Sequence, residues 1–123
     1  MKSRWITHKG QKILYIDYSN FGGDLAGLET EMNAVVALII QQPEESVIGL
    51  TDLRGTTFST EVVQLIKSGG SQIAKHLASK RHALVGITGI RMVLYQAITR
   101  VLGEAPKLFD DVEQAKDWLT RSD

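Results

Sequence analysis

The sequence predicts one α/β domain, a (βα) superhelix with a mostly parallel five-stranded mixed sheet and helices mainly on one face, in the order ββαβαβαβα. Short segments rich in β-branched and aromatic residues alternate with segments whose apolar residues recur at helical spacing. Such alternation indicates parallel strands joined by right-handed crossovers. No linker or low-complexity tract interrupts the 123 residues, so residues 1–123 are expected to form a single domain.

The first two strands are predicted to form a hairpin. Residues Arg4–His8 and Lys12–Ser19 flank Lys9-Gly10-Gln11, which has the composition of a short glycine turn. The second segment is rich in β-branched and aromatic residues, and Asn20–Gly23 ends it.

A long helix is expected next. Asp24 is a good N-cap, the apolar residues that follow have helical spacing, and Pro43 ends the helix. The run from Ala34 to Ile40 is apolar all round the helix, which one core-facing side does not require. It predicts core burial, a subunit contact or the wall of an apolar pocket.

The second unit comprises a strand over Ser46–Leu53, a loop and a helix that Ser59 or Thr60 can cap and that extends to Leu77. Gly69-Gly70 interrupts this helix, at a cost of about 1 kcal/mol per glycine. The helix is therefore either kinked there or packed closely against a neighbour.

The third unit repeats this plan. His82–Thr88 is predicted to be a strand, Gly89 a turn and Ile90–Leu102 a helix with Gly103 as its C-terminal cap.

A short strand and a helix complete the chain. The strand is expected at Lys107–Phe109, and Asp110 or Asp111 can cap a final helix that continues through Leu119.

The two faces of the predicted sheet differ in polarity. One face is expected to carry a consistently apolar set, namely Leu14, Ile16, Ile48, Leu50, Ala83, Val85 and Ile87. The other carries smaller or more polar residues, namely Tyr15, Asp17, Gly49, Thr51, Gly86 and Thr88. A sheet covered by helices on both faces is apolar on both. Most helices are therefore expected on one face, with the other partly open or covered by a partner.

Composition excludes several classes of protein. Fourteen basic residues balance fourteen acidic ones, so no net charge favours nucleic acid, and there are no cysteines for disulfides or thiolate metal sites. The longest apolar run is too short to span a bilayer, and the first residues lack the apolar core of a signal peptide. We expect a cytoplasmic protein without membrane insertion.

Four segments together resemble the STAS-like family, in its largely uncharacterised SpoIIAA-like branch. Thr51–Phe58 looks like the junction between strand and helix in STAS domains. Val85–Ile90, Leu108–Asp110 and Ala115–Leu119 are similar to the SpoIIAA-like branch. The resemblance extends from about Trp5 to Leu119. It implies a (βα) superhelical fold and the regulatory, non-catalytic role of an anti-sigma-factor antagonist.

The resemblance also implies a phosphorylation switch in a turn that aligns with residues 60–63. Relatives carry a serine that a partner kinase phosphorylates, but the aligned position here is Glu61. A shift of one or two residues would make Thr60 or Ser59 the phosphoacceptor. Without a shift, the charge of Glu61 would be a fixed substitute for the phosphate.

The carboxyl ends of the parallel strands are the expected binding edge, because ligands of open α/β sheets bind there. Three loops share this edge, at residues 20–23, 54–60 and 88–91. The candidate residues are Asn20, Phe21, Arg54, Thr56, Thr57, Phe58, Ser59, Thr60, Glu61 and Arg91. The two arginines and the helix N-termini could bind a carboxylate or phosphate. Alternatively, the hydroxyls are caps and turn residues, and the arginines are solvated.

No catalytic or metal site is expected, and no cofactor. The three histidines lack the spacing of a metal pair, and no serine lies in a GxSxG motif. Asp17 and Asp52 occupy equivalent places on neighbouring strands, but a catalytic pair is the less favoured interpretation.

The sequence therefore predicts a non-catalytic regulatory module that binds a protein partner and forms a homodimer. The alternative is a small carrier or sensor that holds an apolar or amphipathic, lipid-like ligand between sheet and helices. CRAL-TRIO domains, which share the architecture implied by the resemblance, bind lipids in this way.

Overall fold

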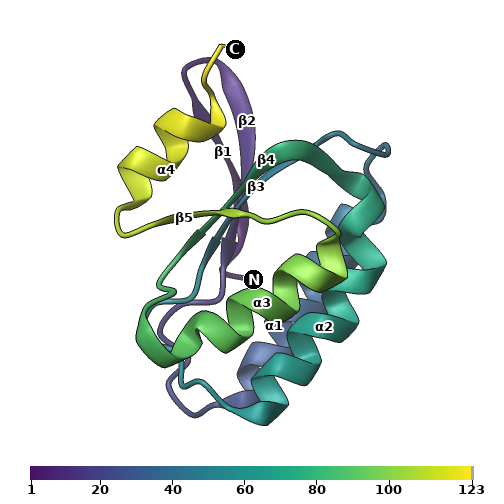
Figure 1. Ribbon diagram of the computed structural model, residues 1–123. Helices are drawn as coiled ribbons and strands as arrows, with labels where there is room; N and C mark the ends of the chain where they lie inside the picture. The colour runs from purple at the N-terminus through teal and green to yellow at the C-terminus, as the bar shows by residue number, and fades with distance from the viewer. Residues whose placement is uncertain (123) are drawn as a thin grey trace.

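The structure is a computed structural model that describes residues 1–122, apart from the side chain of Ile90. Its elements are β1 (Arg4–His8), β2 (Gln11–Asp17), α1 (Leu25–Ile39), β3 (Val47–Asp52), α2 (Thr60–Ile73), β4 (Leu77–Val85), α3 (Met92–Leu102), β5 (Lys107–Phe109) and α4 (Val112–Leu119). Two 3-10 turns, η1 (Ala74–His76) and η2 (Gly89–Arg91), precede β4 and α3. This order confirms the predicted succession of strands and helices (Figure 1).

The five strands lie in the sheet in the same order as in the sequence. β1 pairs with β2 in the antiparallel sense, and β2, β3, β4 and β5 pair in the parallel sense. The sheet is therefore mixed and mostly parallel, as predicted.

The helices are distributed unequally between the two faces of the sheet. α1, α2 and α3 pack side by side on one face, and α4 lies on the other, against β3, β4 and β5 (Figure 1). The prediction that helices lie mainly on one face is confirmed.

The predicted division of strand residues into one apolar and one polar face is wrong. Tyr15 lies opposite Leu50, and Leu50 lies opposite Ala83, so these three share one face. Leu14 and Ile16 lie on the opposite face, under α1 to α3. The prediction failed because alternation within a strand does not determine its register with the next strand, and an offset of one residue exchanges the faces.

The corrected register gives the molecule two apolar cores. The larger core lies between the sheet and α1 to α3 and includes Leu14, Ile16, Leu84 and Ile87. The smaller core lies under α4 and is formed by Ile13, Tyr15, Leu50, Ala83, Val85, Ala115 and Leu119, with Ile48 packed against it. Both faces of the central strands are therefore buried within one chain.

Several predicted boundaries move by a few residues. α2 ends at Ile73, and Leu77, predicted to be helical, begins β4, where it pairs with Val47. β4 also ends at Val85 instead of Thr88, and α3 begins at Met92 after a 3-10 turn. Propensity alone missed the early start of β4 because the polar stretch 79–82 interrupts its apolar pattern.

The predicted caps are confirmed. Asp24 accepts a hydrogen bond from Gly27 N, Ser59 from Val62 N, and Asp111 from Glu113 N and Gln114 N. Gly103 ends α3 in the left-handed conformation, with φ of 74°.

Gly69 and Gly70 lie within a continuous α2 and serve close packing. A Cβ atom at Gly70 would lie 2.9 Å from Val101 Cγ1, and one at Gly69 would lie 3.4 Å from Val36 Cγ2. The two glycines let α2 approach both of its neighbouring helices.

The apolar run of α1 is mainly core. Val35 and Ile39 are fully buried, whereas Ile40 is 49% exposed. Across residues 1–122, no helix has the length and apolar character needed to cross a membrane.

Candidate functional site

The first two loops of the predicted edge form a continuous backbone contact. Asn20 N donates to Arg54 O at 2.8 Å, and Gly22 N donates to Gly55 O at 3.0 Å. Thr57 N returns a hydrogen bond to Gly22 O at 2.8 Å. The sheet is thereby extended beyond β2 and β3 by a short parallel bridge between Gly22 and Thr56.

The buried side chain of Thr56 connects the loop 54–60 to the segment 18–21 by hydrogen bonds. Its side chain is 4% exposed, and its hydroxyl donates to Tyr18 O at 2.6 Å and accepts from Phe21 N at 3.1 Å. A hydroxyl that is engaged in this way has a structural role and does not face a ligand.

Arg91 ties the third loop to the second. Its guanidinium donates to Leu53 O at 2.8 Å and Gly86 O at 3.2 Å, and it also bonds to Thr56 O. The three predicted loops therefore lie together. The guanidinium N–H groups of Arg91 donate to backbone carbonyl oxygens within the chain.

Arg54 is also engaged within the chain. Its Nε and Nη2 atoms bind the two carboxylate oxygens of Asp52 at 3.0 and 2.8 Å, and Tyr15 donates to Asp52 Oδ2 at 2.5 Å. The carboxylate of Asp52 is almost fully buried, whereas half of the Arg54 side chain is exposed. An anion at this edge would have to compete with Asp52 for Arg54.

The pKa values of this cluster follow from its contacts. Burial alone would raise the pKa of Asp52, but hydrogen bonds from Arg54 and Tyr15 hold it below its ordinary value. Burial, reinforced by the hydrogen bond to Asp52, raises the pKa of Tyr15 to about 12. Asp52 is thus a charged structural anchor and Tyr15 a neutral donor near pH 7.

Asp17 and Asp52 do lie opposite each other in β2 and β3. The carboxylate of Asp17, however, accepts from Ser19 and faces Lys2 and Arg4 at 3.6 and 3.5 Å. Each carboxylate has its own cationic partners, which supports the structural interpretation of both residues.

A groove of about 200 Å³ lies at the same edge, between the amino ends of α1 and α2. Leu25, Leu28 and Val62 contribute apolar surface to it, and Thr57 and Glu61 contribute polar groups. Glu61 is exposed, and its side chain has no hydrogen-bond or ion-pair partner among residues 1–122. The groove therefore combines apolar surface with an available carboxylate.

Exposed apolar side chains lie at the amino ends of two of the helices on this face of the sheet. Five large hydrophobic residues are exposed in the described chain, and three of them, Leu25, Met92 and Val93, lie at the amino ends of α1 and α3. α2 lies between these helices (Figure 1). These three residues could not be predicted from the sequence, because helical spacing does not reveal which apolar positions lie beyond the core.

The remaining predicted residues differ in accessibility. Asn20, Thr57 and Thr60 are exposed, and Ser59 is half-buried with its hydroxyl on Val62 N. Phe21 and Phe58 are half-buried and pack against the larger core. Thr60 is therefore the more accessible of the two candidate phosphoacceptors.

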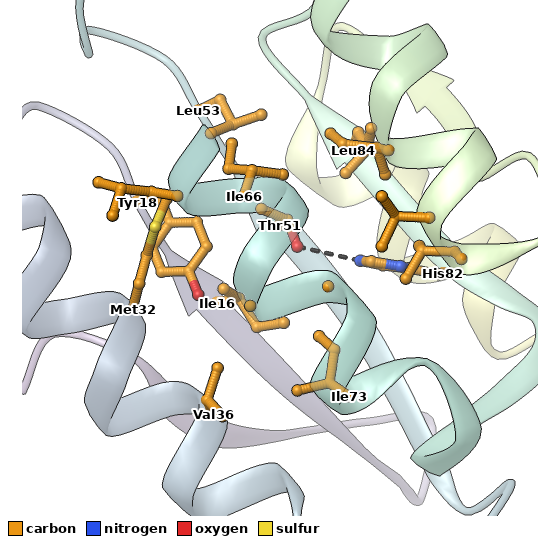
Figure 2. A pocket seen from close by; sticks show the side chains of 16 residues that line it. Ile16, Tyr18, Met32, Val36, Thr51, Leu53, Ile66, Ile73, His82 and Leu84 are labelled. Carbon is orange, nitrogen blue, oxygen red and sulfur yellow. Dashed lines mark hydrogen bonds between the residues drawn. The ribbon is translucent and has the colours of Figure 1, made fainter. Parts of the chain in front are cut away.

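The larger core also contains a cavity of about 50 Å³, which the sequence pattern does not predict. Figure 2 shows side chains of α1, α2, β3 and β4 around it, with Thr51 and His82 joined by a hydrogen bond. Thr51 Oγ1 and His82 Nε2 are 3.0 Å apart. Burial lowers the pKa of His82 to about 4, so the ring is neutral near pH 7. The lining is otherwise almost entirely apolar.

A comparison with known protein families, curated proteins and solved structures finds no match to this chain. In the part of the chain that the structure describes, no group of three or more His, Asp or Glu side chains could hold a metal ion. The functional argument therefore depends on the edge groove and the interior cavity.

Proposed function

We propose that the chain is a non-catalytic protein-interaction module, in keeping with its resemblance to STAS-like anti-sigma-factor antagonists. The observation that supports this function is the groove between the amino ends of α1 and α2, with exposed Leu25 beside it. Apolar side chains gathered at one end of a small domain are typical of an interaction surface. The engaged Arg54 and Arg91 favour a protein partner over a free anion.

The partner segment would carry an apolar side chain next to a lysine or arginine. The apolar group would contact Leu25, Leu28 and Val62, and the cation would approach the carboxylate of Glu61. Electrostatic complementarity of this kind contributes to specificity and to the rate of association. Phosphorylation of Thr60 or Ser59 would add negative charge beside Glu61 and at the amino end of α2, where that charge is favourable.

Reversal of the charge at Glu61 tests this proposal. We expect the Glu61→Lys variant to lose capture of the partner in a pull-down from cell extract, with the captured protein identified by mass spectrometry. The melting temperature should fall only slightly, because a negative charge in the first turn of α2 contributes about 0.3–1 kcal/mol. Glu44→Lys, at the exposed loop before β3, is the matched control. Equal capture by both variants would contradict the proposal.

A second candidate function is a carrier or sensor for an apolar or amphipathic ligand, and the cavity between sheet and helices favours it. Its volume of about 50 Å³ is well below that of an engineered cavity of about 150 Å³ that binds benzene. A lipid would therefore require α2 to move away from the sheet. Native mass spectrometry of freshly purified protein tests this function, since a carrier should retain an added mass.

We also propose that the chain forms a homodimer. The sheet face opposite α1 to α3 is less available than expected, because α4 already covers its apolar residues. The surface of α1, whose C-terminal cap Ile40 is 49% exposed, is the better contact. Light scattering after size exclusion should give twice the mass of the chain, and Ile40→Glu should give the monomer.

A further inference from the structure

β1 has one side without a strand partner. The strand order places β1 at one margin of the sheet and β5 at the other. β5 is only three residues long, and so short an edge strand gives another chain little to pair with. β1 is five residues long and pairs with β2 in an unbroken register. The side of β1 that faces away from β2, its free side, is therefore the longer open margin of the sheet.

The hairpin geometry determines which backbone groups point outward from the free side. The turn residues Lys9 and Gly10 have φ of 51° and 79°, as in a type I′ hairpin, so the two residues that flank them exchange hydrogen bonds. The alternation of an antiparallel pair then directs the N–H and C=O groups of Trp5 and Thr7 away from β2. No hydrogen bond joins these groups to another part of residues 1–122. Two donors and two acceptors are therefore available to an added strand.

The centre of β1 lacks the features that protect edge strands from pairing. Trp5, Ile6 and Thr7 are uncharged, and none of them is a proline. β1 also pairs with β2 without a bulge. Natural edge strands carry a charge, a proline or a bulge where pairing has to be prevented. The free side of β1 therefore remains able to accept an extended segment by β-strand addition.

Cations flank the free side at both ends. Lys2 and Arg4 lie at its amino end and Lys9 at its carboxyl end, and all three are exposed. Lys2 and Arg4 share the single carboxylate of Asp17, at 3.6 and 3.5 Å, so the amino end keeps an excess of positive charge. Residues 1–19 contain four basic and one acidic side chain, a net charge of +3 in a chain whose overall charge is zero. The charges therefore favour a partner with carboxylates.

A second copy of the chain is a poorer match for the free side. In a two-fold antiparallel pairing, Trp5 of each copy would bond to Thr7 of the other. Arg4 of one copy would then lie opposite His8 and beside Lys9 of the other. Like charges that face each other across a pair of strands are destabilising. Cations would meet at both ends of such a pair, which disfavours it.

We propose that the free side of β1 binds an acidic extended segment of another protein, which adds to the sheet as a further antiparallel strand. Its backbone bonds to Trp5 and Thr7, an apolar side chain lies opposite Ile6, and carboxylates lie opposite Arg4 and beside Lys9. In this mode the main-chain bonds supply affinity and the side chains supply specificity. The site goes beyond the proposed function, and it shares no residue with the groove between α1 and α2.

NMR titration of the isotope-labelled full chain with the capped peptide Glu-Glu-Thr-Val-Thr-Glu-Glu tests this site. Its central valine is designed to lie opposite Ile6, with glutamates beyond both ends of the bonded segment. We expect saturable shifts and slower hydrogen exchange at the amides of Trp5 and Thr7, because both N–H groups gain a partner. The same peptide with lysine in place of every glutamate should bind about tenfold more weakly.

Two variants separate the backbone contribution from the charge contribution. Thr7→Pro removes an outward N–H group without removing a bond to β2, and it should weaken binding of the glutamate peptide about tenfold. Thr7→Val keeps that N–H group and is the matched control, which should bind like the original chain. Arg4→Gln should weaken binding about threefold, whereas Arg100→Gln, at an exposed position of α3, should leave it unchanged. Because Arg4→Gln retains every backbone donor, the test remains decisive if Thr7→Pro fails to fold.

Four results would overturn the proposal. They are shifts that do not saturate, saturable shifts at the groove beside Glu61 alone, unchanged affinity in Thr7→Pro, and equal binding of the lysine peptide. Protection of the Trp5 and Thr7 amides that grows with protein concentration in the absence of peptide would also overturn it, because a second copy would then occupy the free side. Glu61→Lys should bind the peptide like the original chain, so failure at the groove and failure at β1 are distinguishable.

Discussion

At the scale of single residues, Asp52 illustrates how a conspicuous polar motif can serve the fold. Its carboxylate is fully committed to Arg54 and to the Tyr15 hydroxyl, beneath the loop that carries the candidate groove. Removal of one partner of such a buried group leaves the others unsatisfied, which costs more than the bond contributed. The edge geometry therefore depends on this cluster although the cluster is not the binding surface.

We expect Asp52→Asn to lower the free energy of unfolding by about 1–3 kcal/mol, because the amide has only one acceptor oxygen. Its NH2 group would face the donors on Arg54 N and Nε, or those on Tyr15 and Arg54 Nη2. Chemical denaturation monitored by circular dichroism measures the loss. Asp110→Asn, at an exposed position beyond β5, is the control and should change stability little. A loss no greater than that of the control would show that the cluster is dispensable.

The same cluster predicts a dependence of stability on pH at both extremes. The folded-state pKa of Asp52 is lowered, so its contribution is present above the unfolded value near 3.8 and is lost as the pH falls. The folded-state pKa of Tyr15 is raised to about 12, so its contribution is present below 10.0 and is lost as the pH rises from 10 to 12. NMR titration of the Tyr15 ring should give the raised pKa, and Asp52→Asn should move it back toward 10. A midpoint near 10 in the original chain would contradict this assignment.

At the scale of elements, the close approach of α2 to its neighbours determines both the packing and the cavity. Gly70 faces Val101 of α3, and Gly69 faces Val36 of α1. Valine is stiff at χ1 in a helix and cannot easily turn away from an added methyl group. The two adjacent glycines should therefore respond differently to the same substitution.

We expect Gly70→Ala to destabilise the chain, because its Cβ would lie 2.9 Å from Val101 Cγ1. Overpacking costs about 1–3 kcal/mol, and better helix propensity returns about 1 kcal/mol, so the net loss is up to about 2 kcal/mol. Val101→Ala should lower the free energy of unfolding less in the Gly70→Ala background than in the original chain, because it removes the methyl group that the new Cβ would contact. A double-mutant cycle measures this difference. Gly69→Ala, with its wider 3.4 Å approach, should be neutral or stabilising. Additive effects at positions 70 and 101 would rule out the contact.

At the scale of the whole molecule, the two cores share the strands of one sheet. β3 and β4 contribute to the larger core with Val47 and Leu84 and to the smaller core with Leu50 and Ala83. The helix α4 is only eight residues long and would be marginal alone. The two halves should therefore unfold together and not as separate units.

Leu119→Ala tests this cooperativity, since Leu119 of α4 is fully buried in the smaller core. We expect a loss of about 2–5 kcal/mol and one transition. The two tryptophans report on the two cores separately, because Trp5 packs against the larger one and Trp118 against the smaller one. Fluorescence of Trp5→Phe and Trp118→Phe backgrounds should give coincident curves. An earlier transition seen only through Trp118 would mean that α4 detaches by itself.

Local signals in the sequence were sufficient for the order of elements and for the caps at Asp24, Ser59 and Gly103, because these depend on neighbours within a few positions. They also placed the three loops at one edge, since parallel strands bring their carboxyl ends together.

Register, by contrast, depends on pairs of residues that are distant in the chain. The strand residues predicted to form one apolar face therefore lie on both faces of the sheet in the structure. The engagement of Arg54 and Arg91 and the groove beside Glu61 likewise arise only when separate elements meet. The same holds for the buried His82 Nδ1, which has no hydrogen-bond partner among residues 1–122. Accessibility and hydrogen-bond satisfaction are properties of packing, and only the tertiary structure decided them.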